Sequence, residues 1–237
     1  MRQRCLQIKI GYSPIGAPQI EALNSNPILS TAYLPPIEWL ALLAGGEVRL
    51  ERLEHYQKQS YRNRTCVITG NGVQHLSVPV LHSATKMPVS EVRIEYKTPW
   101  QRNHWRTLVS AYGNSPYFLF YRDALQPFYE EKTEFLFDFN LRLVQTLLKL
   151  MGIRKRVALT DTFEPLQDGD TRTAIRPGAS AKEDYPFKIA EPYCQVFAER
   201  YGFVPNLSVV DLLFNVGPDS SAYLLRQYRR FNQESGQ

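Results

Sequence analysis

The sequence has few cysteines, and none of them is paired in a motif. Cys5, Cys66 and Cys194 lie far apart, and no Cys-x-x-Cys spacing occurs. An odd and dispersed set of cysteines provides no disulfide framework, so we expect a reducing, cytoplasmic location. Three or four metal ligands at a recognisable spacing are also missing, so we expect no metal site.

Long apolar runs are missing as well. No run approaches the roughly 20 residues that a membrane-spanning helix needs. The basic start of the chain has no long apolar centre and no small-residue cleavage site, so we expect no signal peptide. Residues 1–27 contain Gly and Pro with little periodicity, and residues 5–10 could form a short strand. We therefore expect an N-terminal extension over 1–27 and a single domain over 28–237.

The motifs that hold phosphates in common nucleotide folds do not occur. There is neither a Walker A lysine motif nor a Gly-x-Gly-x-x-Gly loop. Ser115 is not set in a Gly-x-Ser-x-Gly elbow, so it is better explained by a Ser-Pro turn than as a nucleophile. We expect no cofactor.

Acidic residues are fewer than basic ones, 23 against 28, which gives a formal net charge of +5. A positive balance favours an anionic partner, and a nucleotide, a phosphosugar, nucleic acid and a membrane surface all remain open on charge alone. The excess is modest, so we do not expect nucleic acid.

The first part of the domain has the pattern of a strand–helix–strand unit. Residues 28–33 are typical of a short buried strand. Pro35 and Pro36 suit the first turn of a helix, which Gly45-Gly46 would end. Residues 47–53 alternate like a second strand. A parallel βαβ crossover is right-handed, and ligands collect beyond the carboxyl ends of its strands.

The rest of the chain predicts an α/β fold with a mixed sheet, a long buried helix and a helical C-terminal part. Gly70-Asn71-Gly72 between β-branched runs is a strong hairpin signal. The expected strands are 65–69, 73–80, 92–96 and 157–159; the expected helices are 100–112, 130–151, 193–201 and a last one after Pro218, with a long loop over 160–186.

Residues 55–64 are the most polar stretch next to a predicted strand end. They contain one histidine, three cations and two tyrosines, with no acid and no aliphatic residue. We interpret them as the floor of an anion-binding site, because Arg binds phosphate or carboxylate through two parallel hydrogen bonds. The alternative is a solvated loop paired with Glu51 and Glu54. The candidate binding residues are Tyr33, Tyr56, Lys58, Arg62, Asn63, Arg64 and Trp100.

All four histidines fall between positions 55 and 104. A histidine can act as a general base near neutral pH, and an attacking amine would need one. His55 and His104 are our candidates for this catalytic role, because both lie at the ends of predicted elements. The alternative is a histidine that holds a loop by hydrogen bonds. We expect His75 on the exposed face of its strand.

Several separate motifs, in order over residues 28–225, resemble the WbqC-like family. The matching stretches are Tyr33-Leu34-Pro35-Pro36-Ile37-Glu38-Trp39, His55-Tyr56-Gln57-Lys58, Tyr61-Arg62-Asn63-Arg64, Leu76-Ser77-Val78-Pro79-Val80, Trp100 with His104-Trp105, Ala111-Tyr112, Ser115-Pro116-Tyr117-Phe118 and Pro205-Asn206-Leu207-Ser208.

This resemblance implies a link to bacterial surface-polysaccharide genes, including O-antigen clusters, and carries over no catalytic residues. It implies a transferase that adds an acyl or aminoacyl group, such as glycyl, to a nucleotide-linked amino sugar. The partner would be a small anionic substrate, either a nucleotide sugar or a phosphorylated donor. The alternative is a module that binds a nucleotide sugar or phosphate without chemistry.

Overall fold

The computed structural model describes residues 27–81, 87–167, 170–178, 185, 187–189 and 191–234. The expected N-terminal extension lies outside these residues except for Pro27, and so do the possible strand over 5–10 and His82.

The predicted βαβ unit is confirmed. Strand β1 (Ile28–Ser30) leads through helix α1 (Ile37–Gly45) to strand β2 (Arg49–Glu51), which pairs with β1 in parallel. Strand β5 (Ala158–Leu159) adds to the other side of β2, also in parallel. Both strands end earlier than predicted, because the residues after them bond to side chains rather than to the sheet: Thr31 Oγ1 accepts from Asn140 Nδ2, and the Leu53 N–H donates to Glu51 Oε1.

The predicted hairpin is confirmed too, and it forms a sheet of its own. Strand β3 (Arg64–Thr69) pairs antiparallel with β4 (Gly72–Ser77). Gly72 has φ 97°, a conformation that favours glycine at this tight turn. The strand predicted over 92–96 is reduced to isolated bridges from Arg93 and Ile94, because each meets a different partner segment.

Helices make up the rest of the fold, and the predicted helix over 100–112 is confirmed. The long helix begins at Leu136 rather than 130, because residue 135 before it is still extended. The helix predicted over 193–201 is reduced to its last turn. The elements are η2 (Val89–Glu91), α2 (Trp100–Tyr112), α3 (Phe118–Leu125), η3 (Gln126–Tyr129), α4 (Leu136–Leu150), α5 (Thr171–Ala174), α6 (Ala198–Tyr201), α7 (Val209–Val216), η5 (Gly217–Asp219) and α8 (Ser220–Glu234).

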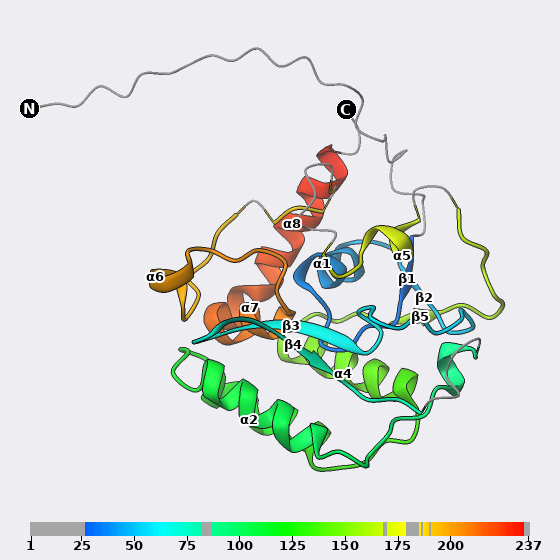
Figure 1. The fold of residues 1–237 in the computed structure, drawn as a ribbon. Helices are drawn as coiled ribbons and strands as arrows, with labels where there is room; N and C mark the ends of the chain where they lie inside the picture. The colour runs from blue at the N-terminus through cyan, green and yellow to red at the C-terminus, as the bar shows by residue number, and fades with distance from the viewer. Residues whose placement is uncertain are drawn as a thin grey trace, which may run out of the picture.

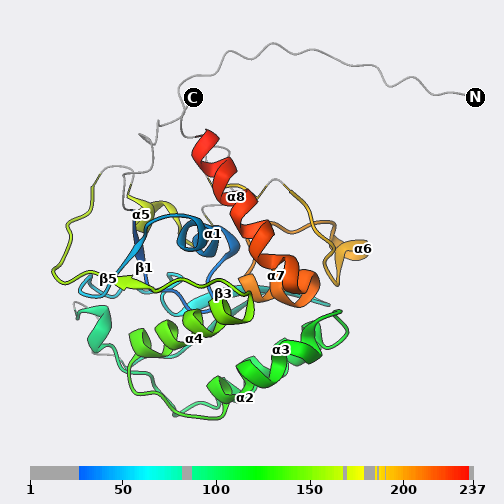
Figure 2. The same cartoon turned by 180° about the vertical axis from the view of Figure 1, so that it is seen from behind.

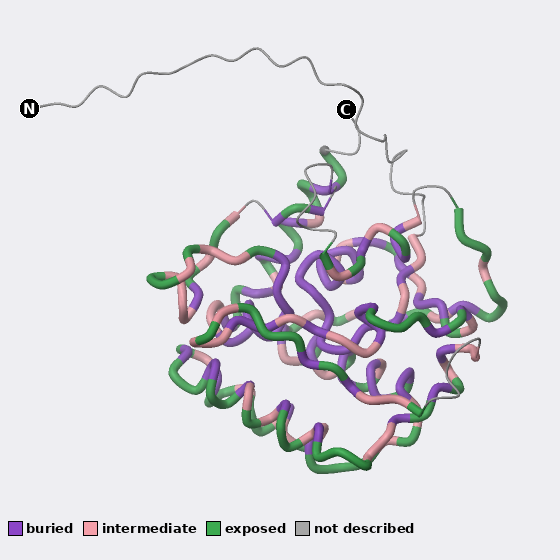
Figure 3. The backbone as a smooth tube through the Cα atoms, viewed as in Figure 1, coloured by how far each residue is buried: buried purple, intermediate pink, exposed green. Residues whose placement is uncertain are grey.

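The layers place the parallel strands near the centre of the molecule. Figure 1 shows α1, α5 and α8 on one side of the strand layer, with α4 on the other and α2 outermost. The view from behind shows α3 and α4 covering the same side as α2 (Figure 2). Helix α2 turns its buried face toward the hairpin and its exposed face outward (Figure 3). The α/β class with a helical C-terminal part is confirmed.

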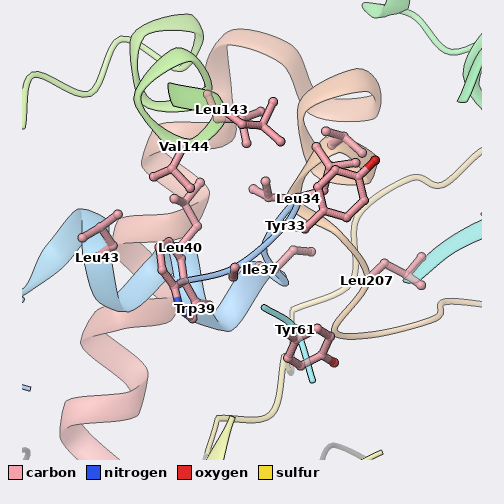
Figure 4. Packing of buried hydrophobic residues seen from close by; sticks show 14 of the residues in the cluster. Tyr33, Leu34, Ile37, Trp39, Leu40, Leu43, Tyr61, Leu143, Val144 and Leu207 are labelled. Atoms are coloured by element: carbon pink, nitrogen blue, oxygen red, sulfur yellow. The ribbon is translucent and has the colours of Figure 1, made fainter. Parts of the chain in front are cut away.

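The segment that leads into α1 is fastened to the C-terminal part of the chain. Leu34 has φ 41°, which is strained for a leucine. Its carbonyl accepts hydrogen bonds from Thr65 Oγ1 at 2.7 Å and Ser208 Oγ at 3.0 Å. In Figure 4, the rings of Tyr33 and Tyr61 lie on opposite sides of this segment. The segment therefore separates two environments in the protein, that of the Tyr33 ring on one side and that of the Tyr61 ring on the other.

Candidate functional site

A buried ion pair lies beside the carboxyl end of β1. Arg62 Nε donates to Glu54 Oε1 at 2.9 Å, and Arg62 Nη2 donates to Glu54 Oε2 and to Ser30 Oγ, the latter at 2.8 Å. Only 4% of the Arg62 side chain and 7% of the Glu54 side chain are exposed. Glu54 thus takes the place of solvent for a guanidinium that the fold has buried.

A second buried arginine comes from the stretch predicted to be a long loop. Arg172 Nε donates to both oxygens of Asp170, the residue that caps α5. Arg172 Nη1 lies 3.6 Å from Oε2 of Glu51, the last residue of β2. Glu51 in turn accepts from Thr160 Oγ1 at 2.8 Å. Arg172 was not among the predicted site residues; the local sign of order beside it is Asp170, a residue type that favours the start of a helix.

The two arginines line a pocket at the ends of the parallel strands, which we call the strand-end pocket. Its empty volume is about 250 Å³, including solvent at its mouth. The hydrogen bonds of Arg62 to the described residues use Nε and Nη2, which leaves the Nη1 donors for a bound group. The lining residues are Leu29, Ser30, Thr31, Ala32, Trp39, Tyr61, Arg62, Thr171, Arg172 and Ile175.

The charges around the strand-end pocket are nearly balanced. Two guanidinium groups face the carboxylates of Glu51, Glu54 and Asp170. An anionic group would therefore be held by directed N–H donors rather than by a net positive field. The carboxylates would equally attract an ammonium group.

The other side of the Tyr33 segment is a buried aromatic cluster, made of Tyr33, Trp100, His104, Tyr129 and Phe139. The Tyr33 hydroxyl lies 2.9 Å from His104 Nδ1 and 3.1 Å from the Tyr129 hydroxyl. Trp100 packs edge-on against the His104 ring, with 5.2 Å between ring centroids. Burial lowers the pKa of His104 to about 4, so its imidazole is neutral at pH 7.

The residues expected to form one site are divided between these two places and the surface. Of the expected binding residues, Arg62 is the one that lines the strand-end pocket; Tyr33 and Trp100 belong to the aromatic cluster. His55 and Lys58 are exposed. The remaining candidates are placed by local contacts: Tyr56 is buried, Asn63 Nδ2 donates to the Val78 carbonyl and Arg64 Nε donates to Ser77 Oγ.

Among the described residues, no group of three or more metal-ligating side chains is close enough together to hold a metal ion. No helix in the described part of the chain combines the length and apolar character needed to cross a bilayer.

The fold and the strand-end pocket define an α/β protein with a candidate ligand site at the carboxyl ends of a short parallel sheet. The sequence profile described as the WbqC-like protein family matches residues 31–185, and the chain belongs to this family. The match begins directly after β1 and runs to Tyr185, so it includes the aromatic cluster and all of the pocket lining except Leu29 and Ser30.

One relative is an uncharacterised protein of Mycobacterium tuberculosis. It is 31% identical over 194 residues, which cover 71% of this chain and 83% of that protein. No solved structure matches the chain.

Proposed function

We propose that this protein is a transferase that adds an acyl or aminoacyl group, such as glycyl, to a nucleotide-linked amino sugar in surface-polysaccharide synthesis. The strand-end pocket would hold one polar group of the substrate. The observation that carries this proposal is the buried Arg62, whose Nη1 donors are left for a ligand where ligands of parallel sheets collect.

The size and charge of the pocket support partial rather than complete enclosure of the substrate. The pocket is narrow and partly open to solvent, so it could enclose one polar group but not a whole small-molecule ligand. A phosphate or carboxylate would bind to the guanidinium donors, while the amine of an amino sugar would be drawn to the surrounding carboxylates. The rest of the molecule would extend into solvent.

The general base remains a prediction for His55 or His104. His104 is buried, and its Nδ1 is held by Tyr33. His55 is exposed at the end of the segment that follows β2, so it is the more open of the two to a bound acceptor.

Binding of UDP-glucosamine, measured by calorimetry, tests the pocket. Arg62→Lys keeps a positive charge beside Glu54 but removes the guanidinium donors. A lost charge-assisted hydrogen bond is worth about 1.5–3 kcal/mol, so we expect the Kd to rise about 10-fold or more. Arg49→Lys is the matched control, because Arg49 forms a partly exposed pair with Glu164 in the same sheet and does not line the pocket. Equal Kd values for the two variants would contradict the proposal.

A binding module without chemistry is the second candidate. It is favoured by one observation: neither His55 nor His104 lines the strand-end pocket. Incubation with UDP-glucosamine and a glycyl thioester, followed by mass spectrometry, separates the two. A glycylated sugar would support the transferase, whereas tight binding without product would support the module.

A further inference from the structure

Away from the strand-end pocket, reactive side chains meet on one face of the β3–β4 hairpin. The register places Cys66 opposite His75 and Arg64 opposite Ser77. Side chains two residues apart on a strand share a face, so Arg64 and Cys66 point the same way. Cys66 Sγ lies 3.1 Å from His75 Nδ1, which is hydrogen-bonding distance.

This contact has the geometry of a nucleophile and its base. His75 is exposed and Cys66 is half-buried, so a substrate can approach the pair. Burial raises the pKa of the Cys66 thiol to about 11, with Arg64 opposing the shift and Glu38 adding to it. The thiol is therefore protonated at neutral pH, and it needs a base within reach when it attacks.

A buried carboxyl group near the pair is a second, independent sign of a polar site. Glu38 is fully buried in α1, and its Oε1 accepts a hydrogen bond from the Tyr185 hydroxyl at 2.9 Å. Its Oε2 has no hydrogen bond of good geometry among the described residues, although the Asn206 side chain is close enough to oppose the rise in the pKa of Glu38. Such unsatisfied buried oxygens are rare in folded proteins and call for a specific cause, such as a missing donor group.

We propose that Cys66 and His75 form a nucleophilic pair that carries the acyl group as a thioester between donor and acceptor. This inference rests on the proposed acyl transfer and gives it two steps. It assigns Cys66 as the acyl carrier, His75 as the base for the thiol and Arg64 as the cation that stabilises the developing oxyanion.

The two steps balance without a further reactant. In the first, Cys66 Sγ attacks the acyl carbon of an activated ester or thioester donor. A C–S bond forms, His75 Nδ1 takes the thiol proton and passes it to the departing alcohol or thiol, and the bond to that group breaks. In the second, the amine of the sugar attacks the thioester, a C–N bond forms, and the C–S bond breaks. A proton from the amine restores the thiol.

Tyr61 links the pair to the strand-end pocket. It lines the pocket, and its electrostatic interaction with Cys66 is among the causes that raise the pKa of Tyr61, after burial and Glu38. An acceptor bound at Arg62 and a thioester on Cys66 would therefore both lie near this residue.

Acetylation by p-nitrophenyl acetate tests the pair in the full chain. Cys5 and Cys194 are first changed to alanine, which leaves Cys66 as the single thiol. We expect intact-mass measurement to show one acetyl group on Cys66, accompanied by one equivalent of p-nitrophenolate. His75→Gln should slow acetylation about 100-fold or more, the usual contribution of a general base. Gln74→Ala, at the exposed position next to His75 on β4 whose side chain points to the other face of the hairpin, is the control and should leave the rate unchanged.

The pH profile separates a base from a merely structural histidine. In His75→Gln the acetylation rate should keep rising with pH toward the thiol pKa of about 11, because only the thiolate reacts without a base; with His75 present the rate should depend much less on pH. The inference is overturned if Cys66 stays unmodified, or if the rate and its pH profile are the same in His75→Gln. Glycylated sugar formed by Cys66→Ala would overturn the covalent step and leave the transferase proposal standing.

Discussion

The strand-end pocket and the aromatic cluster lie on opposite sides of one short segment, yet their buried polar side chains are stabilised in different ways. In the pocket, polar groups are buried because each charge has a partner: Arg62 with Glu54, and Arg172 with Asp170. In the cluster, the polar group is made neutral instead, since burial lowers the pKa of His104 to about 4. Charged residues held by partners can still offer unused donors to a ligand, whereas a neutral histidine packed between rings mainly supports the fold.

The largest expected effect comes from breaking the ion pair in the strand-end pocket. Glu54→Ala leaves the Arg62 guanidinium buried without its carboxylate, which costs about 3–5 kcal/mol. We expect urea unfolding to show this loss in the free energy of unfolding. The double variant Glu54→Leu with Arg62→Met should recover much of it, because no charge is then left unpaired. A double variant as unstable as the single one would contradict this explanation.

The next effect is a pH dependence from the aromatic cluster. The folded pKa of His104, about 4, lies below the unfolded value of 6.5, so the unfolded chain binds the proton first. The neutral His104 imidazole makes its full contribution to the free energy of unfolding above pH 6.5. About 3 kcal/mol of this contribution is lost as the pH falls toward 4.

The measurement is the difference in unfolding free energy between the natural chain and His104→Gln across this pH range. Burial raises the pKa of Glu38 to about 7 and that of Asp211 to about 6, and both effects act in the opposite direction. Because both variants contain these two residues, their contributions cancel in the difference. A difference that does not change with pH would show that His104 is not held neutral.

A smaller effect is expected from removing the Tyr33 hydroxyl, which forms hydrogen bonds within the aromatic cluster. Tyr33→Phe removes the hydrogen-bond partner of both His104 and Tyr129 while keeping the ring. We expect a loss of about 1–3 kcal/mol in unfolding free energy, because buried polar groups are left unsatisfied. Tyr56→Phe is the matched control, since the Tyr56 hydroxyl forms no hydrogen bond to a described residue; it should change stability by less.

The smallest effect on stability is expected at the surface. His55→Ala removes an exposed side chain, so the free energy of unfolding should change by no more than about 0.5 kcal/mol. If His55 is the base for the acceptor amine, turnover should nevertheless be lost, as the rate of product formation would show. Full turnover in this variant would remove His55 from the proposal.

Local patterns were enough for most of the elements. The double proline before α1, the Gly-Asn-Gly turn of the hairpin and the spacing of apolar residues in α2 and α8 each act over a few residues. The predictions were wrong where contacts between distant segments determine the local structure. Residues 92–96 meet two other segments as isolated bridges, and an extended residue precedes the start of α4.

The candidate site was foreseen only in part. The position at the carboxyl ends of β1 and β2 and the choice of Arg62 followed from the βαβ pattern. Arg172 could not be found, because nothing in a Gly- and Asp-rich loop indicates that one of its arginines folds back onto Glu51. The pairing of Cys66 with His75 was not predicted, although the hairpin was, because it depends on the exact register that the two strands adopt.

The sequence by itself determined the α/β class, the hairpin and the family, since periodicity, turn residues and ordered motifs are properties of neighbouring positions. Only the tertiary structure decided which polar residues share a site. It placed His104 among aromatic rings, buried Arg62 and Arg172 against carboxylates and set a thiol beside an imidazole. The physical reason is that burial and pairing depend on contacts between residues far apart in the chain, which no local pattern records.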